Sequence, residues 1–279
     1  MLLLDSASNL ARASDARAIM VYADALPEIT AVPARTILVL REGADIRRSK
    51  ALLNSAAGSI LVPAVTLSRF GQVTLATIIA LSNRKIDVGD TIVCLSGPYR
   101  SIIDTILVMT VGPEFELFDA ADQSAEDEPI RRAVFHRLLG IALQLGQHGR
   151  EGRRTGAIFV IGDSEHVLKQ SEQMILNPFR GYSEEERNVL DDRMTETLKE
   201  FSTLDGAFII SGTGIVETAG ARIRVGISEG LPSGLGSRHA AAAGITALTR
   251  SIAITVSSSD GNVRVWRAGR MLAEFEPEM

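Results

Sequence analysis

One acidic residue, Asp205, stands at the start of an apolar run of strand length. Residues 208–210, Phe-Ile-Ile, are apolar enough for a buried strand, and a carboxylate at its entry stays in contact with water. Gly206 and Ala207 have almost no side chain, so a ligand could lie against their backbone. A carboxylate in such a place can bind a divalent metal ion or accept a proton from a hydroxyl group.

A second segment, residues 234–239, combines small and cationic residues in the order Gly-Leu-Gly-Ser-Arg-His. The alanine-rich run 240–243 follows it and favours a helix. A glycine-containing turn that leads into a helix presents unpaired N–H groups and the positive end of the helix dipole. Arg238 adds a fork of donors that matches a phosphate group. The acid and the cationic helix start together indicate metal-assisted chemistry on a phosphate ester.

These segments, with two others, resemble the diadenylate cyclase (DAC) family. That family usually carries D-G-A followed by G-T-R-H-R, and this chain has D-G-A at 205–207 and G-S-R-H-A at 236–240. Residues 156–160, G-A-I-F-V, are similar to the family's G-A-L-I-V strand, and residues 254–258, I-T-V-S-S, to its V-V-S-E-E. The four similarities occur in the family's order over roughly the last half of the chain. Ser237 keeps a hydroxyl, whereas Ala240 removes a phosphate-binding cation.

The resemblance implies that two ATP molecules condense to cyclic di-AMP and two pyrophosphates, with Mg²⁺ or Mn²⁺ as cofactor. Asp205 would be the metal ligand and could act as base, while Arg238 and His239 would complete the catalytic set. The residues implied to line the nucleotide site are Gly206, Ala207, Gly236, Ser237, Arg238, His239, Ser257 and Ser258. Each domain of this family holds one ATP, so the resemblance also implies a homodimer, or a higher oligomer, with two-fold symmetry at the site.

The residues by themselves leave other interpretations open. Asp205 could be a solvated acid at a strand edge, and Arg238 a surface ion-pair residue. Ala240 is compatible with a domain that binds ATP or cyclic di-AMP without making it. A third interpretation is a metabolic regulator related to pyruvate kinase, with the second domain as ligand sensor. Arg222 or Arg224 could replace the missing cation, and the arginines at 150, 153 and 154 could hold a triphosphate or be solvated.

Length and composition set further limits. A chain of 279 residues favours two domains, and 46% hydrophobic with 23% charged residues is typical of a soluble globular protein. The formal net charge of −5 argues against a general partner that is nucleic acid or an anionic membrane. The single cysteine, Cys94, excludes a disulfide within the chain and favours the cytoplasm. No apolar run is long enough for a membrane span.

The first half predicts an α/β domain over residues 1–120. Strand-length apolar runs at 18–22, 36–40, 59–62, 91–95 and 106–111 alternate with helical patterns at 6–18, 47–53 and 68–82. This alternation is typical of a Rossmann-like layer of parallel strands. Residues 86–93 resemble the K-x-G-D-x-V-V turn and strand of the pyruvate kinase C-terminal domain. That resemblance implies a regulatory or oligomerising domain, and one branch of diadenylate cyclases carries such a domain before the cyclase.

The second half predicts a linker at 121–128, in an acidic stretch, and a cyclase domain at 129–279. Helices are expected at 129–147, at 183–201 after a capping box formed by Ser183 and Glu186, and from the Arg-His pair to about 249. Strands are expected at 157–161, 208–210, 252–256 and 263–266, with a hairpin turn at Asp260-Gly261. The expected fold is an α/β domain whose mixed central sheet is flanked by helices.

Overall fold

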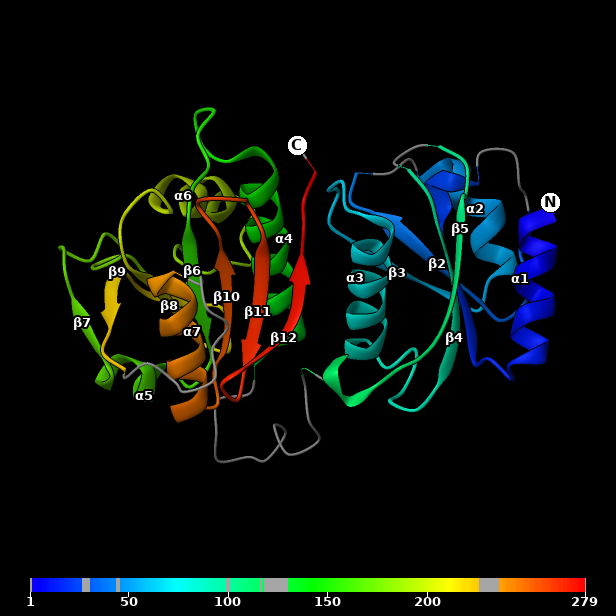
Figure 1. Ribbon diagram of the computed structural model, residues 1–279. Coiled ribbons are helices and arrows are strands. Elements are labelled where there is room, and N and C mark those ends of the chain that lie inside the picture. Colours follow the sequence, from blue (N-terminus) through cyan, green and yellow to red (C-terminus); the bar gives the residue numbers. More distant parts are fainter. Residues whose placement is uncertain are drawn as a thin grey trace. The chain divides into compact units, whose positions relative to one another are not determined.

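The computed structural model describes residues 2–26, 31–43, 46–98, 101–115, 117, 130–225 and 236–278. It divides the chain into two compact units, residues 1–117 and residues 118–277 (Figure 1). Each unit is an α/β structure with its own sheet. The linker expected at 121–128 lies outside the described residues. Within the described ranges, none of the helices combines the length and the apolar content that crossing a bilayer requires.

The first unit is built on a five-stranded sheet in the order β3-β2-β1-β4-β5. Its strands are β1 (Ala18–Tyr22), β2 (Thr36–Arg41), β3 (Gly58–Val62), β4 (Thr91–Ser96) and β5 (Thr105–Thr110). The first four run parallel, and β5 runs antiparallel to β4. Its helices are α1 (Leu2–Ala13), α2 (Ile46–Ser55) and α3 (Arg69–Ser82), with single 3-10 turns η1 (Ala23–Ala25) and η2 (Pro113–Phe115).

Local sequence accounts for much of this unit. All five residues of β1 are buried, because β1 lies between β2 and β4 and needs apolar side chains on both faces. Helix α3 begins where the sequence predicts, since the Ser68 hydroxyl accepts a hydrogen bond from the Gly71 N–H at 3.1 Å. The first helix differs from the prediction of 6–18: it begins at Leu2 and ends at Ala13, before Asp15 adopts a left-handed backbone with φ 51°.

The second unit is built on a seven-stranded sheet in the order β12-β11-β10-β6-β8-β9-β7. Its strands are β6 (Ala157–Ile161), β7 (Ser171–Gln173), β8 (Ala207–Ile210), β9 (Val216–Ile223), β10 (Ile252–Val256), β11 (Val263–Arg267) and β12 (Arg270–Phe275). Its helices are α4 (Arg132–His148), α5 (Ser164–Lys169), α6 (Arg193–Phe201) and α7 (Ser237–Leu248). Strands β6 and β8 pair in parallel and the other neighbours pair antiparallel, so the sheet is mixed, as predicted.

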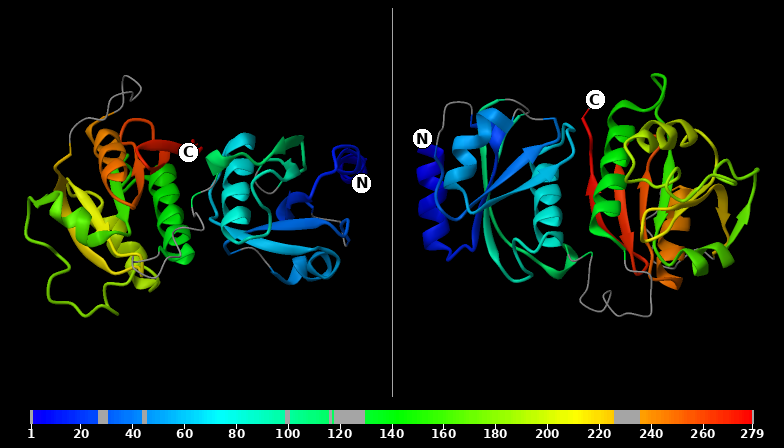
Figure 2. Two further views of the ribbon diagram at one scale, coloured as in Figure 1. Left: turned by 90° about the horizontal axis from the view of Figure 1, so that it is seen from below. Right: turned by 180° about the vertical axis from the view of Figure 1, so that it is seen from behind.

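Both faces of this sheet are covered by helices (Figures 1 and 2). Ile158 and Val160 of β6 pack in one apolar cluster with Ala242 and Ala243 of α7. Phe159 lies between them in the strand, points to the opposite face, and stacks on Phe208 with ring centroids 5.0 Å apart. Helix α4 covers that opposite face. The small side chains of α7 let its N-terminal turns lie close to the sheet.

The helix predicted at 183–201 starts later than expected. The capping-box contacts form, with the Ser183 hydroxyl donating to Glu186 at 2.8 Å, but the chain continues in turns and α6 begins at Arg193. Tertiary hydrogen bonds hold the intervening residues to other segments: the Arg187 guanidinium donates to the Val216 carbonyl at 2.7 Å, and the Val189 N–H donates to Gly214 at 2.8 Å. These bonds outweigh the local preference for a helix.

Candidate active site at one edge of the second sheet

Strand directions bring four separate segments to one edge of the second sheet. Strands β6 and β8 are parallel, so the residues that precede each of them lie at the same edge. Strand β10 runs the other way, with Val256 opposite Ala157, so the residues that follow it also lie there. Helix α7 begins at this edge, because its Arg238 contacts Asp205, which comes two residues before β8.

The central contact of the site joins Arg238 to Asp205. The Arg238 Nη2 donates to Asp205 Oδ1 at 3.3 Å. The carboxylate side chain is 84% exposed and the arginine side chain 31% exposed. A pair with so much solvent access contributes little to stability, so a phosphate group could replace Asp205 as the partner of Arg238 at small cost. The acid and the cation therefore face the same solvent-accessible edge.

Two glycines make this arrangement possible. A Cβ at Gly156 would stand 2.8 Å from Arg238 Nη1 and 3.1 Å from the Cβ of Ser258, so only glycine leaves space for the guanidinium. At Gly206 the backbone has φ 109°, and a Cβ would stand 2.7 Å from the backbone of Gly220 on β9. The first glycine makes room for the cation, and the second lets β8 begin directly beside β9.

His239 lies behind Arg238 in the first turn of α7 and is 6% exposed. Its Nε2 is 3.0 Å from the Nη1 of Arg264 on β11, and Arg264 in turn pairs with Glu274 at 2.5 Å. Burial, and then the positive charge of Arg264, lower the pKa of His239 below its usual range. His239 is therefore neutral at pH 7.

Two nitrogen atoms of this turn have no hydrogen-bond partner among the described residues although they are buried: Arg238 Nε and His239 Nδ1. Buried polar atoms in folded proteins are almost always paired, so an unpaired group calls for an explanation. A ligand with oxygen acceptors, such as a phosphate group, would supply it. The Arg238 atom can only donate, which selects an acceptor.

The remaining site residues predicted from the sequence differ in which of their groups a ligand could contact. Gly236 and Ser237 are exposed at the start of α7, where the backbone N–H groups have no side-chain cap. Ala207 is 1% exposed and its side chain belongs to the core below α7, so it offers only backbone. Ser258 lies beside Arg238, whereas the buried Ser257 hydroxyl is used in its own turn, at 3.0 Å from the Ser259 hydroxyl. Gly234 and Leu235 lie outside the described residues.

Asp205 is the exposed carboxylate that this site presents to a metal ion. Among the described residues no group of three or more His, Cys, Asp or Glu side chains could hold a metal ion. Mg²⁺ is commonly held by one or two carboxylates together with water and substrate phosphates, rather than by a protein cage. The exposed Asp205 fits that kind of site, with the phosphates as the other ligands.

The arginines considered as a replacement for the cation missing at Ala240, or as partners of a triphosphate, lie in different places. Arg222 follows Ala221, which pairs with Ala207, but its guanidinium pairs with Glu172 at 2.6 Å. Arg154 reaches the site edge and donates to the Ser259 carbonyl at 3.0 Å. Arg150 pairs with Glu196 and Glu200 of α6 instead.

The sequence interpretation did not name Arg264 and Glu274 as parts of the site. The available signal was an arginine inside the apolar strand Val-Arg-Val-Trp at 263–266, where every residue proves buried. A charged residue in such a strand needs a partner. The partner could not be identified from the sequence, because Glu274 and His239 reach Arg264 only through the β11–β12 hairpin and the packing of α7.

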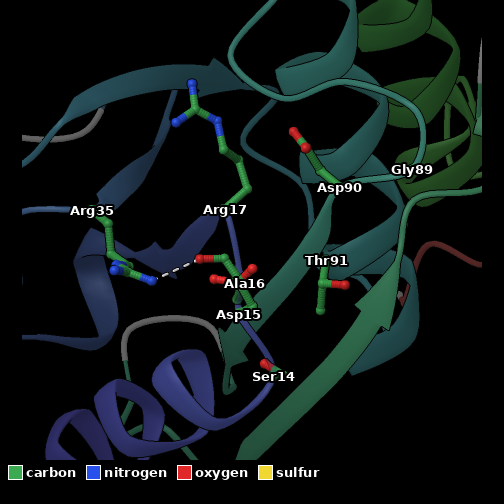
Figure 3. A pocket seen from close by; sticks show the side chains of 8 residues that line it. All are labelled: Ser14, Asp15, Ala16, Arg17, Arg35, Gly89, Asp90 and Thr91. Carbon is green, nitrogen blue, oxygen red and sulfur yellow. Dashed lines mark hydrogen bonds between the residues drawn. The ribbon is translucent and has the colours of Figure 1, made fainter.

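The first unit contains a pocket of about 630 Å³, separate from the candidate active site (Figure 3). It lies where β1, β2 and β4 begin, and Arg17, Arg35, Asp15 and Asp90 bring charges of both signs to it. Arg35 donates to the Ala16 carbonyl at 2.8 Å and so holds the turn before β1. The segments that resemble the diadenylate cyclase family all lie in the second unit, so the candidate active site is assigned there.

Comparison with known proteins agrees with this assignment. Residues 144–271 match a family model described as "DisA bacterial checkpoint controller nucleotide-binding". A protein of Haloferax volcanii called diadenylate cyclase is 36% identical over 203 residues, which cover 71% of this chain and 72% of that protein. This chain belongs to the diadenylate cyclase family. A family member from Methanocaldococcus jannaschii is 38% identical over 181 residues, which cover 63% of this chain and 56% of that diadenylate cyclase.

The other comparisons concern the first unit and the fold. Residues 2–118 match a family model described as "Probable sensor domain DacZ_P", and the resemblance to the pyruvate kinase C-terminal domain stays a prediction. A solved double mutant of DacA from Staphylococcus aureus aligns with 52% of this chain and 86% of its own, at 21% identity and a TM-score of 0.33.

Proposed function

We propose that this protein is a diadenylate cyclase, which condenses two ATP molecules into cyclic di-AMP and releases two pyrophosphates. The observation that carries the proposal is the pairing of Asp205 with Arg238 at 3.3 Å on the solvent-accessible edge where β6 and β8 begin. The unpaired nitrogen atoms of Arg238 and His239, next to that pair, support an anionic ligand. Membership of the diadenylate cyclase family supports the choice of ATP as that ligand.

The reaction consists of two equivalent substitutions at phosphorus. In each, the 3′-oxygen of one ATP forms a bond to the α-phosphorus of the other, and the bond from that phosphorus to the oxygen bridging to the β-phosphate breaks. The 3′-hydroxyl proton passes to Asp205 or to water, and the bond electrons leave with pyrophosphate. A 3′-hydroxyl is a weak nucleophile, so a carboxylate beside it contributes to catalysis.

Fixed positive charge has to meet the negative charge that spreads over the transferring phosphate. In this proposal the N-terminal N–H groups of α7 and the Arg238 guanidinium supply it, and Ser237 adds a hydroxyl. When ATP binds, its phosphates replace Asp205 as the partner of Arg238. The exchange leaves the Asp205 carboxylate available to the 3′-hydroxyl or to a metal ion.

A divalent metal ion, Mg²⁺ or Mn²⁺, would be held by Asp205 together with ATP phosphates. When bound, such an ion neutralises phosphate charge and lowers the pKa of a coordinated hydroxyl. The residues of the chain do the rest: the backbone of Gly206 and Ala207 lines the nucleotide site, and Arg238 orients the phosphates.

The two-fold product implies two copies of the site facing each other. One unit contains one Asp205-Arg238 pair, so each copy would bind one ATP, and the two copies would form a C₂ homodimer or part of a higher oligomer. In that case specific activity rises with protein concentration until the dimer is saturated. A specific activity that is independent of concentration, in a protein that is monomeric by mass in solution, would contradict the dimer.

The test of the enzyme uses purified full-length protein with ATP and either Mg²⁺ or Mn²⁺, with products separated by chromatography. We expect cyclic di-AMP from the natural chain, none from Asp205→Asn, and normal amounts from Asp192→Asn. Asp192 is a suitable control because it is an acid of the same unit that is 91% exposed and pairs with Arg137, away from the site. No cyclic di-AMP with either metal would overturn the proposal.

A second function has one specific observation in its favour. Ala240 follows His239 where the family usually has a second arginine, and loss of that cation could leave a domain that binds ATP or cyclic di-AMP without turnover. Calorimetric titration with both nucleotides distinguishes the two: binding without turnover supports the sensor. Turnover by the natural chain eliminates it.

We further propose that the first unit, residues 1–117, regulates or oligomerises the cyclase, with the boundary between 117 and 130 and the linker at 121–128. Its similarity to a probable sensor domain supports a regulatory role. Deleting residues 1–125 tests the idea, and unchanged activity together with unchanged mass in solution would remove it. The single Cys94 is buried, which suits the reducing cytoplasm as location.

A further inference from the structure

A row of three side chains, His239, Arg264 and Glu274, lies next to the Arg238-Asp205 pair, and the first two are buried. His239 of α7 is 6% exposed and Arg264 of β11 is 8% exposed. The Arg264 Nη1 lies 3.0 Å from His239 Nε2, and its Nη2 lies 2.5 Å from Glu274 Oε1 on β12. The Asn262 side-chain amide also donates to Glu274 Oε1 at 3.1 Å, so the carboxylate and the guanidinium are both held in place.

The chemistry of a guanidinium decides which ring nitrogen of His239 carries the proton. Arginine only donates hydrogen bonds, so at 3.0 Å the Nε2 of His239 has to accept with its lone pair. A neutral imidazole whose Nε2 accepts has its hydrogen on Nδ1. The doubly protonated ring would place an N–H against the guanidinium, and burial and the Arg264 charge lower the pKa of His239, which disfavours that form.

The Nδ1 of His239 is then a donor that still needs an acceptor. It is buried and has no hydrogen-bond partner among the described residues. It lies 4.0 Å from the position that a Cβ would take on Gly236, so it faces the start of α7. The unpaired Nε of Arg238 lies one residue away in the same turn. Two donors without acceptors in one helix turn indicate an oxygen-rich anion.

We infer that Arg264 is a positioning residue, which fixes His239 as a neutral Nδ1–H donor to a phosphate oxygen of bound ATP. This inference rests on the proposed function, because ATP supplies the phosphate. It excludes His239 as the base for the 3′-hydroxyl, since Nε2 is occupied by Arg264 and Nδ1 already carries a proton. The chain has Ala240 where the family usually has a second arginine, and Arg264 places a buried cation beside His239 instead.

A purely structural role for the same residues makes a different prediction. The Arg264-Glu274 pair links β11 to β12, and its loss would lower stability whatever His239 does, because the buried Arg264 would lose a partner for its charge. A test therefore needs a signal from the His239 ring itself, and a variant that removes both charges together.

The experiment uses the full chain with ¹⁵N-labelled histidine, followed by NMR. The sequence has four histidines, and His239→Gln identifies the signals of His239. We expect a protonated, pyrrole-type Nδ1 and an unprotonated, pyridine-type Nε2 at pH 7, and we expect ATP without added metal to shift the Nδ1 signal. A protonated Nε2, or an Nδ1 signal that ATP does not move, would overturn the inference.

The variants connect this signal to turnover. In the double variant Arg264→Met with Glu274→Gln we expect mixed tautomers of His239 and a loss of kcat of roughly tenfold or more, by analogy with the loss caused when the partner that orients a metal-binding histidine is removed. Arg264→Lys should keep part of the single tautomer of His239 and part of kcat, because lysine can also donate a hydrogen bond to Nε2. Arg270→Met is the control, since Arg270 is exposed on β12 of the same sheet. Thermal unfolding shows whether each variant is folded.

The outcomes separate the two proposals. If the natural chain makes no cyclic di-AMP, but Nδ1 is protonated and responds to ATP, the proposed function fails and the donor role of His239 stands as ATP binding. If cyclic di-AMP is made while the folded double variant keeps the tautomer of His239 and the turnover of the natural chain, only the positioning role fails.

Discussion

The guanidinium of Arg238 occupies the space that a side chain at Gly156 would need. A Cβ there would come within 2.8 Å of Arg238 Nη1, although 82 positions, 238 minus 156, separate the two residues in the chain. Gly156 directly precedes β6, and Arg238 lies in the first turn of α7. The glycine thus determines where the cation of the proposed phosphate site can lie.

Gly156→Ala should therefore displace the Arg238 guanidinium without unfolding the chain. We expect kcat/KM for ATP to fall by roughly tenfold or more, because misplacing a phosphate-orienting group by about 1 Å can cost a hundredfold. Steady-state kinetics measures the effect, and thermal unfolding shows whether the fold is kept. Gly58→Ala in the first unit is the control, since the nearest atom to its added Cβ is the flexible end of Lys85 at 3.3 Å. Equal kinetics for both variants would show that Arg238 tolerates the displacement.

Arg238→Lys keeps the positive charge but loses the planar fork. Lysine offers a point charge where arginine can bind two phosphate oxygens at once, so we expect KM for ATP to rise and kcat to fall, with kcat/KM lower by about tenfold, or about 1.4 kcal/mol. Arg193→Lys is the matched change at an 81% exposed arginine of α6. An unchanged KM and kcat in Arg238→Lys would mean that the fork does not contact the substrate.

Gly206→Ala should lower stability more than an alanine at another glycine with a similar backbone. Gly206 and Gly181 have φ of 109° and 95°, but an added Cβ meets the Gly220 backbone at 2.7 Å in the first case and nothing within 4 Å in the second. Backbone strain alone costs about 1–2 kcal/mol, so Gly181→Ala should show that loss and Gly206→Ala a larger one. Urea unfolding of both variants measures the difference. Equal losses would mean that β8 and β9 can move apart at no cost.

The free energy of unfolding should decrease as the pH falls from about 6.5 to about 4. Burial, and then the nearby Arg132, lower the pKa of His136 on α4 from 6.5 to about 4. In that window the unfolded chain binds a proton that the folded chain does not, so stability is full above pH 6.5 and falls by up to about 3 kcal/mol towards pH 4. The lowered pKa of His239 acts in the same direction.

Urea unfolding at several pH values tests this, with His136→Gln expected to flatten the slope. If His136→Gln has the slope of the natural chain, the dependence comes from other groups.

Local chemistry was enough to predict many elements of both units from the sequence. Strand β1 has the predicted bounds Ala18–Tyr22, and α3 begins at the predicted cap Ser68, because burial patterns and caps depend on neighbouring residues. The family membership predicted from the Asp-Gly-Ala and Arg-His segments was confirmed by the relatives. The start of α6 at Arg193 was missed, since hydrogen bonds to distant segments keep residues 187–190 out of the helix.

What only the tertiary structure decided is which side chains meet. The sequence names Asp205 and Arg238 but does not place them 3.3 Å apart, because that distance follows from strand order and from where α7 packs. The pairing of His239 with Arg264 depends likewise on contact between α7 and β11, two elements whose residues carry no local sign of each other. Residue type fixes what a group can do chemically, whereas the order of strands in the sheet fixes which groups can act together.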